Sequence, residues 1–586
     1  MMKTKYINTI FTIVFCFLVA LIFCYPFLNG SILIGPDTAF HMNRIEALSI
    51  AIQNNDFFPR LFYHQNFYFG YGSPMFYSVF FLYFPAWLRI LGLSIYDSYH
   101  VFLFTCAFLA SVTMFKCATL VLGKKRNLYS CLTVVFYIWN CFYISDFYKR
   151  GAIGEVLAFI FLPIAIMGMF YSVHGERKKH YTLLFGFCGL LLSHNITFII
   201  MVILYAVYLL INWKILLNDK SRMITIACIA LFGILITCFF IFPMLEQLAS
   251  GDYRIHSYFG TESLSELALD IGAVFDFRTD ASNYLCDSLG PFLLFVPLFY
   301  IFVRKQAKSR LTTFLILAGY IMVFMTTKYF PWGLFQFLSF LQFPTRLLVP
   351  AMACLALGAG YTIANLPLRK EIRLQFTNSI FIIALITCIL QLFGVLTSPG
   401  LITRSTTADE IKNDEQFLKR AEWYNLLELS TPDYLPADTA INYREYQSKI
   451  ISNNEEKERE TITYTEYNNF VFTYGSIQKD AYYIMPLTYY KGYVAEIYDG
   501  ETLLETVAAY RDPETGLVRF DPSPIQTKAN EIRFKVYYKG TTLQKVTGWI
   551  SFLSLSFYLV ATTFDFLIHH FRSSKKPLVK RRRITT

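Results

Sequence analysis

Long apolar runs with few charges limit what this chain can fold into. Runs of about 20 residues recur along it, and a helix of that length crosses the hydrocarbon core of a bilayer. Of the 586 residues, 55% are hydrophobic and only 16% are charged. One soluble core cannot accommodate so many apolar runs, so we expect a polytopic α-helical membrane protein.

About twelve spans are predicted from the length of these runs. They are 6–28, 99–122, 129–146, 153–173, 180–193, 196–212, 223–243, 289–303, 311–326, 346–365, 376–396 and 547–569. The first run has no small-residue cleavage site after it, which favours an uncleaved anchor over a signal peptide. We expect its N-terminus to lie in the cytoplasm.

The basic residues predict how the spans are oriented. If the aromatic segment 74–93 is re-entrant or interfacial rather than a span, every basic loop lies on the side of the N-terminus: 124–126, 177–179, 214–222, 304–310, 369–373 and the C-terminal tail. Cytoplasmic loops carry this excess of Lys and Arg. The net charge of +11 is therefore expected to face lipid headgroups rather than nucleic acid. The predicted location is a plasma membrane.

Three regions follow from this pattern. Residues 1–396 form a transmembrane module with a first external loop at 29–98, and residues 547–586 form a last helix with a basic tail. Between them, 397–546 is predicted to be extracytoplasmic, helical over 397–460 and β-rich over 461–546. Alternating runs at 461–467, 482–487, 493–497, 503–510, 517–520 and 531–538, with a hairpin turn at Asp499-Gly500, predict a β-sandwich.

One motif in the first loop groups acid, base and cation. Asp37, His41 and Arg44 are spaced i, i+4 and i+7, so a helix would place them on one face. Asp37 can also serve simply as the N-cap of that helix, for which Asp is a favoured residue. Capping and chemistry do not exclude each other.

Further polar groups are predicted on the same outer side, where ionisable residues near membrane depth are functional candidates. Each has a simpler alternative. Arg150 and Glu155 can pair to orient a helix, His194 and Asn195 can satisfy backbone freed at a helix break, and Arg346 can be an interfacial anchor. The loop acids Asp270, Asp276, Asp280 and Asp287 can bind an acceptor or a metal, or be solvated.

Together these residues suit the transfer of a sugar from a lipid phosphate. A carboxylate takes the proton of the acceptor hydroxyl, and cations stabilise the departing phosphate. Asp37 with His41 would be catalytic, Arg44, Arg150 and Arg346 would bind phosphate, and Glu155, His194 and Asn195 would contact substrate.

The chain also resembles a known family. The segments that carry the resemblance are Gly35 to Ile45, Phe58-Pro59-Arg60, Gly70 to Tyr77, Arg150 to Glu155, Leu192 to Asn195, Phe343 to Arg346, Asp433 to Pro436 and Tyr538 to Leu543. In this order they are similar to GT-C-type bacterial membrane glycosyltransferases, in a branch labelled "6-pyruvoyl-tetrahydropterin synthase-related" membrane proteins. No zinc-binding histidine set supports the pterin label.

The resemblance implies a GT-C-like fold, a polyprenyl-phosphate-linked sugar as donor and a cell-envelope glycopolymer or glycolipid as acceptor, with Asp37 matching the first-loop catalytic acid. A second adjacent acid is missing, so a divalent metal is compatible with the sequence but not required by it. An envelope-lipid flippase and a non-catalytic assembly scaffold remain the alternatives; a flippase would favour two related halves with paired broken helices, which the sequence lacks.

Overall fold

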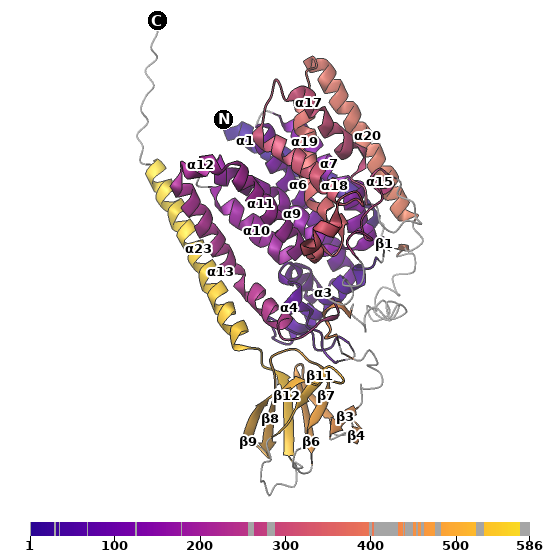
Figure 1. The fold of residues 1–586 in the computed structure, drawn as a ribbon, viewed down its shortest axis with the longest axis vertical. Helices are drawn as coiled ribbons and strands as arrows, with labels where there is room; N and C mark the ends of the chain where they lie inside the picture. Colours follow the sequence, from indigo (N-terminus) through magenta and orange to yellow (C-terminus); the bar gives the residue numbers. More distant parts are fainter. Residues whose placement is uncertain are drawn as a thin grey trace.

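The computed structural model describes residues 2–28, 31–33, 35–66, 68–123, 126–176, 179–255, 263–277, 287–397, 401–403, 432–437, 439, 449–452, 455–458, 462–474, 482–522 and 532–574. Within these ranges, a bundle of helices carries a smaller layer of strands at one end (Figure 1). Most of the region predicted to be helical, 397–460, lies outside the described residues, and its described part includes three strands, Leu401–Thr403, Lys449–Ser452 and Glu455–Glu458, which that prediction did not include.

In the described part of the chain, seven helical segments are long and apolar enough to cross a membrane. They are Tyr6–Phe23 of α1 (Met2–Phe23), α6 (Ile95–Leu122), α9 (Ile153–Val173), α13 (Lys220–Leu248), Pro344–Ala364 with α19 (Leu348–Ala364), α20 (Lys370–Leu396) and Thr542–Phe564 of α23 (Thr542–Ser574). An eighth is bent by 47° between Asn127–Ile138 (α7) and Cys141–Arg150. The described residues thus form a helical membrane module.

Helices lie at all twelve predicted positions, but twelve crossings are not confirmed. The other four are shorter than a full span: α10 (Tyr181–Ser193), α11 (Asn195–Ile211), Gly290–Val303 and α18 (Arg310–Met325). Hydropathy located these helices correctly. Their length depends on where each one breaks, as between α10 and α11, where one residue separates the two.

The two ends of the bundle differ in composition. Figure 1 shows the start of α1, helix α12 (Trp213–Leu217), helix α17 (Tyr300–Val303) and the end of α23 at one end, and α3 (Thr38–Gln53), α4 (Ser73–Phe76) and the sheets at the other. The first end carries the loops 214–222 and 304–310. The basic loops and the first-loop motif therefore lie at opposite ends of the molecule.

The segment 74–93 folds into short pieces beside α3. Its helical part, Phe80–Ile90, includes α5 (Tyr83–Ile90) and is among the helices too short to count as spans. The Arg89 guanidinium forms an ion pair with Glu46 of α3 at 2.7 Å. This geometry agrees with the prediction that the segment does not cross.

Among the described strands, two five-stranded sheets form the C-terminal layer, in the orders β10-β11-β7-β3-β4 and β5-β6-β12-β8-β9. Their facing aromatic side chains share one core, with the rings of Tyr483 and Phe534 5.0 Å apart. The strands are β3 (Lys449–Ser452), β4 (Glu455–Glu458), β5 (Ile462–Glu466), β6 (Asn469–Tyr474), β7 (Tyr483–Thr488), β8 (Tyr493–Asp499), β9 (Thr502–Ala508), β10 (Tyr510–Arg511), β11 (Leu517–Phe520) and β12 (Ile532–Tyr538).

The strand predictions are largely right. Asp499 pairs with Thr502, so Gly500 and Glu501 make the expected two-residue turn. The prediction missed β3, β4 and β6, and it took the charged stretch 453–460 as a break. Strand β4 lies at a sheet edge, and charged residues are a usual composition for edge strands.

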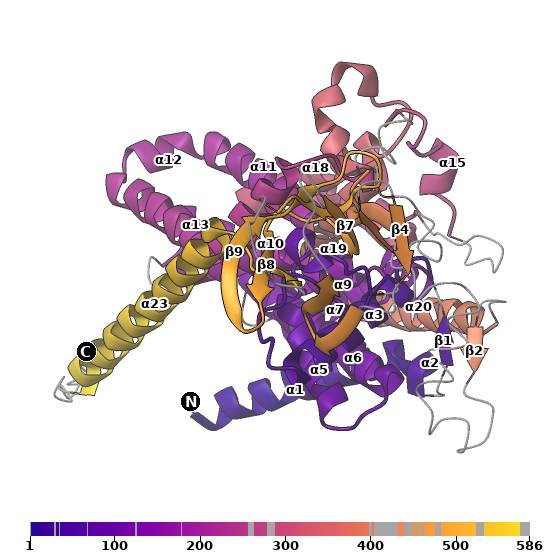
Figure 2. The ribbon, with the colours of Figure 1, turned by 90° about the horizontal axis from the view of Figure 1, so that it is seen from below.

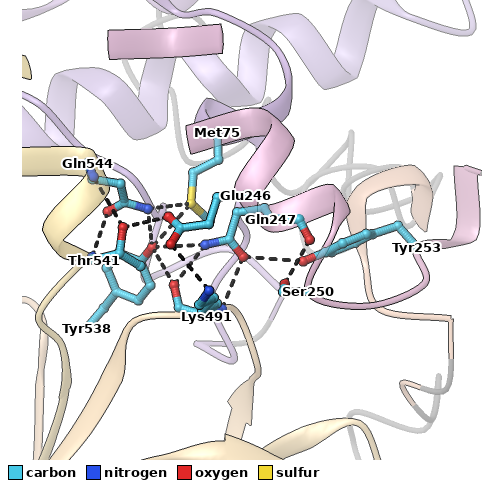
Figure 3. Close-up of polar contacts among 9 residues, drawn as sticks. All are labelled: Met75, Glu246, Gln247, Ser250, Tyr253, Lys491, Tyr538, Thr541 and Gln544. Atoms are coloured by element: carbon cyan, nitrogen blue, oxygen red, sulfur yellow. Dashed lines mark hydrogen bonds and ion pairs between the residues drawn. The ribbon is translucent and has the colours of Figure 1, made fainter. Parts of the chain in front are cut away.

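A buried polar network joins the sandwich to the bundle (Figure 3). Gln247 of α13 is fully buried, donates to the backbone carbonyl of Lys491 at 2.8 Å and accepts from its amide at 3.1 Å. Tyr538 accepts from Gln544 of α23 at 2.7 Å. Figure 2 shows α13 and α23 side by side. The helices that supply Gln247 and Gln544 to this network therefore pack against each other.

Candidate functional site

Asp37 sits at the start of α3, against the turn that precedes α9. Its amide donates to the carbonyl of Arg150 at 2.9 Å. It occupies the N-cap position, yet its side chain makes no capping hydrogen bond. Its carboxylate therefore does not cap the helix, and the alternative in which Asp37 serves only as an N-cap is not supported.

Two glycines allow this close approach. A Cβ on Gly35 would lie 1.9 Å from the carbonyl oxygen of Lys149, and one on Gly151 would lie 2.2 Å from Oγ1 of Thr38. Gly151 also has φ of +69°, in the left-handed region that glycine adopts without strain. The segment that starts at Gly35 thus packs directly against the turn at Gly151, with no room for a side chain at either glycine.

Glu155 is the centre of a buried ionic cluster. Its carboxylate lies 3.1 Å from Nη1 of Arg150, 3.8 Å from Nε of Arg346 and 3.9 Å from Nε2 of His194. These groups come from the turn before α9, from α9 itself, from the break between α10 and α11, and from the turn before α19. Four predicted site residues from separate parts of the chain are brought together here.

The charges of this cluster act on Asp37 and change the pKa of its carboxyl. Burial raises the pKa of the Asp37 carboxyl above its ordinary value, while the Arg150 guanidinium opposes the rise, Glu155 adds to it and Arg346 opposes it. A carboxylate with raised proton affinity is a stronger base than an exposed one. The nearby cations favour its ionised form.

His41 and Arg44 are placed differently from the prediction. Arg44 is 1% exposed, and its Nη2 donates to the carbonyls of Tyr77 and Ser78 at 2.6 and 2.9 Å. Its guanidinium lies 4.4 Å from the Tyr77 ring centroid and its Nη1 lies 3.3 Å from Nδ1 of His41. Arg44 therefore holds the first loop together, and its predicted role in binding phosphate is not supported.

His41 shares this interior position. Burial lowers the pKa of its imidazole well below the ordinary value, and the charge of Arg44 lowers it further. It is therefore neutral at pH 7, with Nδ1 facing a donor. Its backbone amide donates to the Asp37 carbonyl at 3.1 Å, so it supports the turn that carries Asp37.

His194 and Asn195 serve the helix break and also border the cluster. Nδ1 of His194 accepts from the amide of Thr197, which caps α11, while its Nε2 faces Glu155. Nδ2 of Asn195 lies 3.4 Å from the carbonyl of Phe76. His194 and Asn195 therefore bond to backbone groups near the helix break, as the simpler alternative expected, and His194 also lies next to Glu155.

Two acids near the site were not predicted. Asp146 is fully buried and lies 2.7 Å from Nη1 of Arg150, one helical turn away in sequence. That i, i+4 spacing was the signal that could have identified it. Asp433 raises the pKa of Asp37, although 396 positions separate them, and no local pattern links the two.

Asp433 belongs to a strap, residues 432–437, that is tied down at several points. The backbone of Leu435 accepts from Arg254 at 3.0 Å, and that of Tyr434 accepts from the hydroxyl of Tyr490 at 3.0 Å. The Tyr434 ring stacks on Phe76 with centroids 5.3 Å apart. Through this strap the extramembrane region contributes to the surroundings of Asp37.

Of the acids predicted in the loop before α16 (Gly290–Phe295), Asp287 lies near the cluster and Asp270 lies at the surface. Burial raises the pKa of Asp287, and the charge of Arg150 opposes the rise, so Asp287 lies within range of the cluster. Asp270 forms an exposed ion pair with Lys328 at 3.1 Å, and Asp280 is outside the described residues. Among the described side chains, no three His, Cys, Asp or Glu residues gather closely enough to hold a metal ion.

Comparison with known proteins adds one relative. An uncharacterized protein of Lactococcus lactis subsp. cremoris (strain MG1363) is 25% identical over 348 residues, which is 56% of this chain. The match spans 55% of that relative's length. No protein-family profile matches the chain.

Proposed function

We propose that this protein is an inverting glycosyltransferase of the GT-C type. It moves a sugar from a polyprenyl-phosphate donor to a cell-envelope polymer or lipid on the outer face of the membrane. The observation that carries the proposal is the convergence of Asp37 with Arg150, Glu155 and Arg346. A buried base beside guanidinium groups at the end of a helical membrane module matches what this reaction requires.

In the proposed reaction, Asp37 takes the proton of the acceptor hydroxyl as its oxygen attacks the anomeric carbon. The bond from that carbon to the phosphate oxygen breaks, and its electron pair leaves with the phosphate. Charge then accumulates on phosphate oxygens, where a cation stabilises the transition state more than the ground state. One displacement inverts the configuration at the anomeric carbon.

Arg346 is the best-suited phosphate ligand of the three predicted arginines. Its Nε is buried with no hydrogen-bond partner among the described residues, and its contact with Glu155 is long, at 3.8 Å. Arg150, by contrast, forms ion pairs with Asp146 at 2.7 Å and with Glu155 at 3.1 Å. We assign donor phosphate to Arg346 and the support of the cluster to Arg150.

The proposed orientation places the site outside the cell. The basic loops 214–222 and 304–310 lie at the end opposite to Asp37 and the sandwich, and such loops normally stay in the cytoplasm. The sandwich then lies beside the site on the acceptor's side of the membrane.

Mass spectrometry of envelope polymers and lipid-linked sugars in a deletion strain tests the proposal. An undecorated polymer together with an accumulated polyprenyl-linked sugar is the expected result. Re-expressed Asp37→Asn should fail to restore decoration at wild-type protein level. Asp56→Asn, a partly buried acid just beyond α3, is the matched control and should restore it.

Two outcomes would contradict the proposal. Full decoration by Asp37→Asn would remove the catalytic assignment and favour a scaffold. An unchanged polymer with a defect in lipid transport would favour a flippase.

A further inference from the structure

An apolar groove lies on the flank of the bundle, away from the polar cluster. It has a volume of about 780 Å³ and runs between α11 and α18, which are neighbours in Figure 1. Its walls are mainly aliphatic and aromatic side chains, such as Leu204, Val207, Phe314, Leu317 and Ile321. Grooves of this composition accept lipid chains rather than polar ligands.

The charged residues of the groove are gathered at one end. Arg304, Lys308 and Arg310 line it there, between the end of α17 and the first residue of α18. All three are exposed, and none pairs with a carboxylate in the described part of the chain. Three cations without a counter-ion at the mouth of an apolar groove complement an amphiphile with an anionic head.

A polar group without a partner lies at this same end. Tyr208, near the end of α11, lines the groove and is 2% exposed. Its hydroxyl has no hydrogen-bond partner among the described residues. Its ring is 5.1 Å from that of Phe314, near the start of α18, so it lies just inside the basic mouth.

The opposite end of the groove offers no cation. Phe335, Leu341 and Leu347 form it, and the adjacent Arg346 turns toward Glu155 instead. Among the residues that line the groove, positive charge is present only at the end formed by Arg304, Lys308 and Arg310.

We propose that the groove binds an anionic phospholipid of the leaflet at the basic end of the molecule. Its phosphate lies at Arg304, Lys308 and Arg310, and its acyl chains lie along α11 and α18. The binding is independent of the proposed transferase activity. It holds together two helices that are each too short to be a full span.

The test uses the full-length chain purified in mild detergent. Bound lipids are counted by native mass spectrometry, and the retained species are identified after extraction. The protein is then titrated with phosphatidylglycerol and with phosphatidylcholine. The test variant combines Arg304→Gln, Lys308→Gln and Arg310→Gln. The matched control combines Lys214→Gln, Lys220→Gln and Lys370→Gln, exposed cations that do not line the groove.

The wild type should retain phosphatidylglycerol in preference to phosphatidylcholine. The groove triple variant should lose about tenfold or more of this affinity, while the control changes less than about twofold. Ile321→Trp, which fills the groove at a 57% exposed position, should lower binding with the cations intact. Equal retention by the triple variant, no retained phospholipid in the wild type, or a retained polyprenyl phosphate would each overturn the proposal.

Discussion

Asp37 shows how one residue depends on charges supplied by the rest of the fold. Burial raises the pKa of its carboxyl and Arg346 opposes that rise. In the proposed reaction only the ionised form is active, so the rate falls as the pH drops through this pKa. The acid limb of the pH–rate profile therefore lies above the ordinary range of an aspartate.

Removing the positive charge of Arg346 should move that limb. In Arg346→Gln the pKa of Asp37 rises further, because a cation that favours its ionised form is lost, and the limb shifts to higher pH. Arg346→Lys keeps the charge and should leave the limb in place while weakening donor binding. The measurement is the transfer rate against pH; a limb that does not move in Arg346→Gln would separate Arg346 from the base.

Gly151 tests the contact that positions Asp37. Gly151→Ala adds a Cβ 2.2 Å from Thr38 Oγ1 at a φ of +69°, and we expect a loss of about 1–3 kcal/mol in stability. Gly272→Ala is the control, because a Cβ there meets nothing within 4 Å. Thermal unfolding of both variants in detergent measures the difference, and equal melting temperatures would contradict this account of the contact.

Among the elements, the strap 432–437 links the extramembrane region to the site. Tyr434→Ala removes the ring that stacks on Phe76. We expect faster proteolysis near the strap and slower transfer, with little change in the unfolding of the bundle. Tyr434→Phe keeps the ring and should behave as wild type. Normal transfer in the Ala variant would mean that the strap does not act on the site.

At the same scale, Gln247 couples helix α13 to the sandwich. Gln247→Ala leaves the amide of Lys491 without its partner, which costs roughly 1–3 kcal/mol, while the carbonyl of Lys491 keeps the hydroxyl of Tyr538 at 3.1 Å. Hydrogen exchange should become faster at the amide of Lys491 and stay unchanged at the amides of β8 and β12, which pair with each other. Thr225→Ala is the control, because its exposed hydroxyl bonds to the carbonyl of Ser221 in the same helix, at 2.9 Å. Unchanged exchange at Lys491 would show that the network is dispensable.

At the scale of the whole molecule, the separation of basic loops from the sandwich predicts which ends face the two compartments. Single cysteines placed in a cysteine-free background report this through a membrane-impermeant thiol reagent. Glu514→Cys, in the sandwich, should react in intact cells. Lys305→Cys, in a basic loop, should react only after permeabilisation. The reverse result would place the site on the cytoplasmic face and would contradict the proposed function.

The sequence by itself determined the positions of the helices, most strands of the sandwich and the turn at Gly500, because these follow from local apolar length and alternation. It also singled out Asp37, Arg150, Glu155 and Arg346. Only the tertiary structure decided that Arg44 turns inward to backbone carbonyls while Arg346 joins Glu155, and that Asp433 comes near Asp37. Which cation meets which acid depends on packing between segments hundreds of residues apart, and the spacing of residues along a helix carries no information about that.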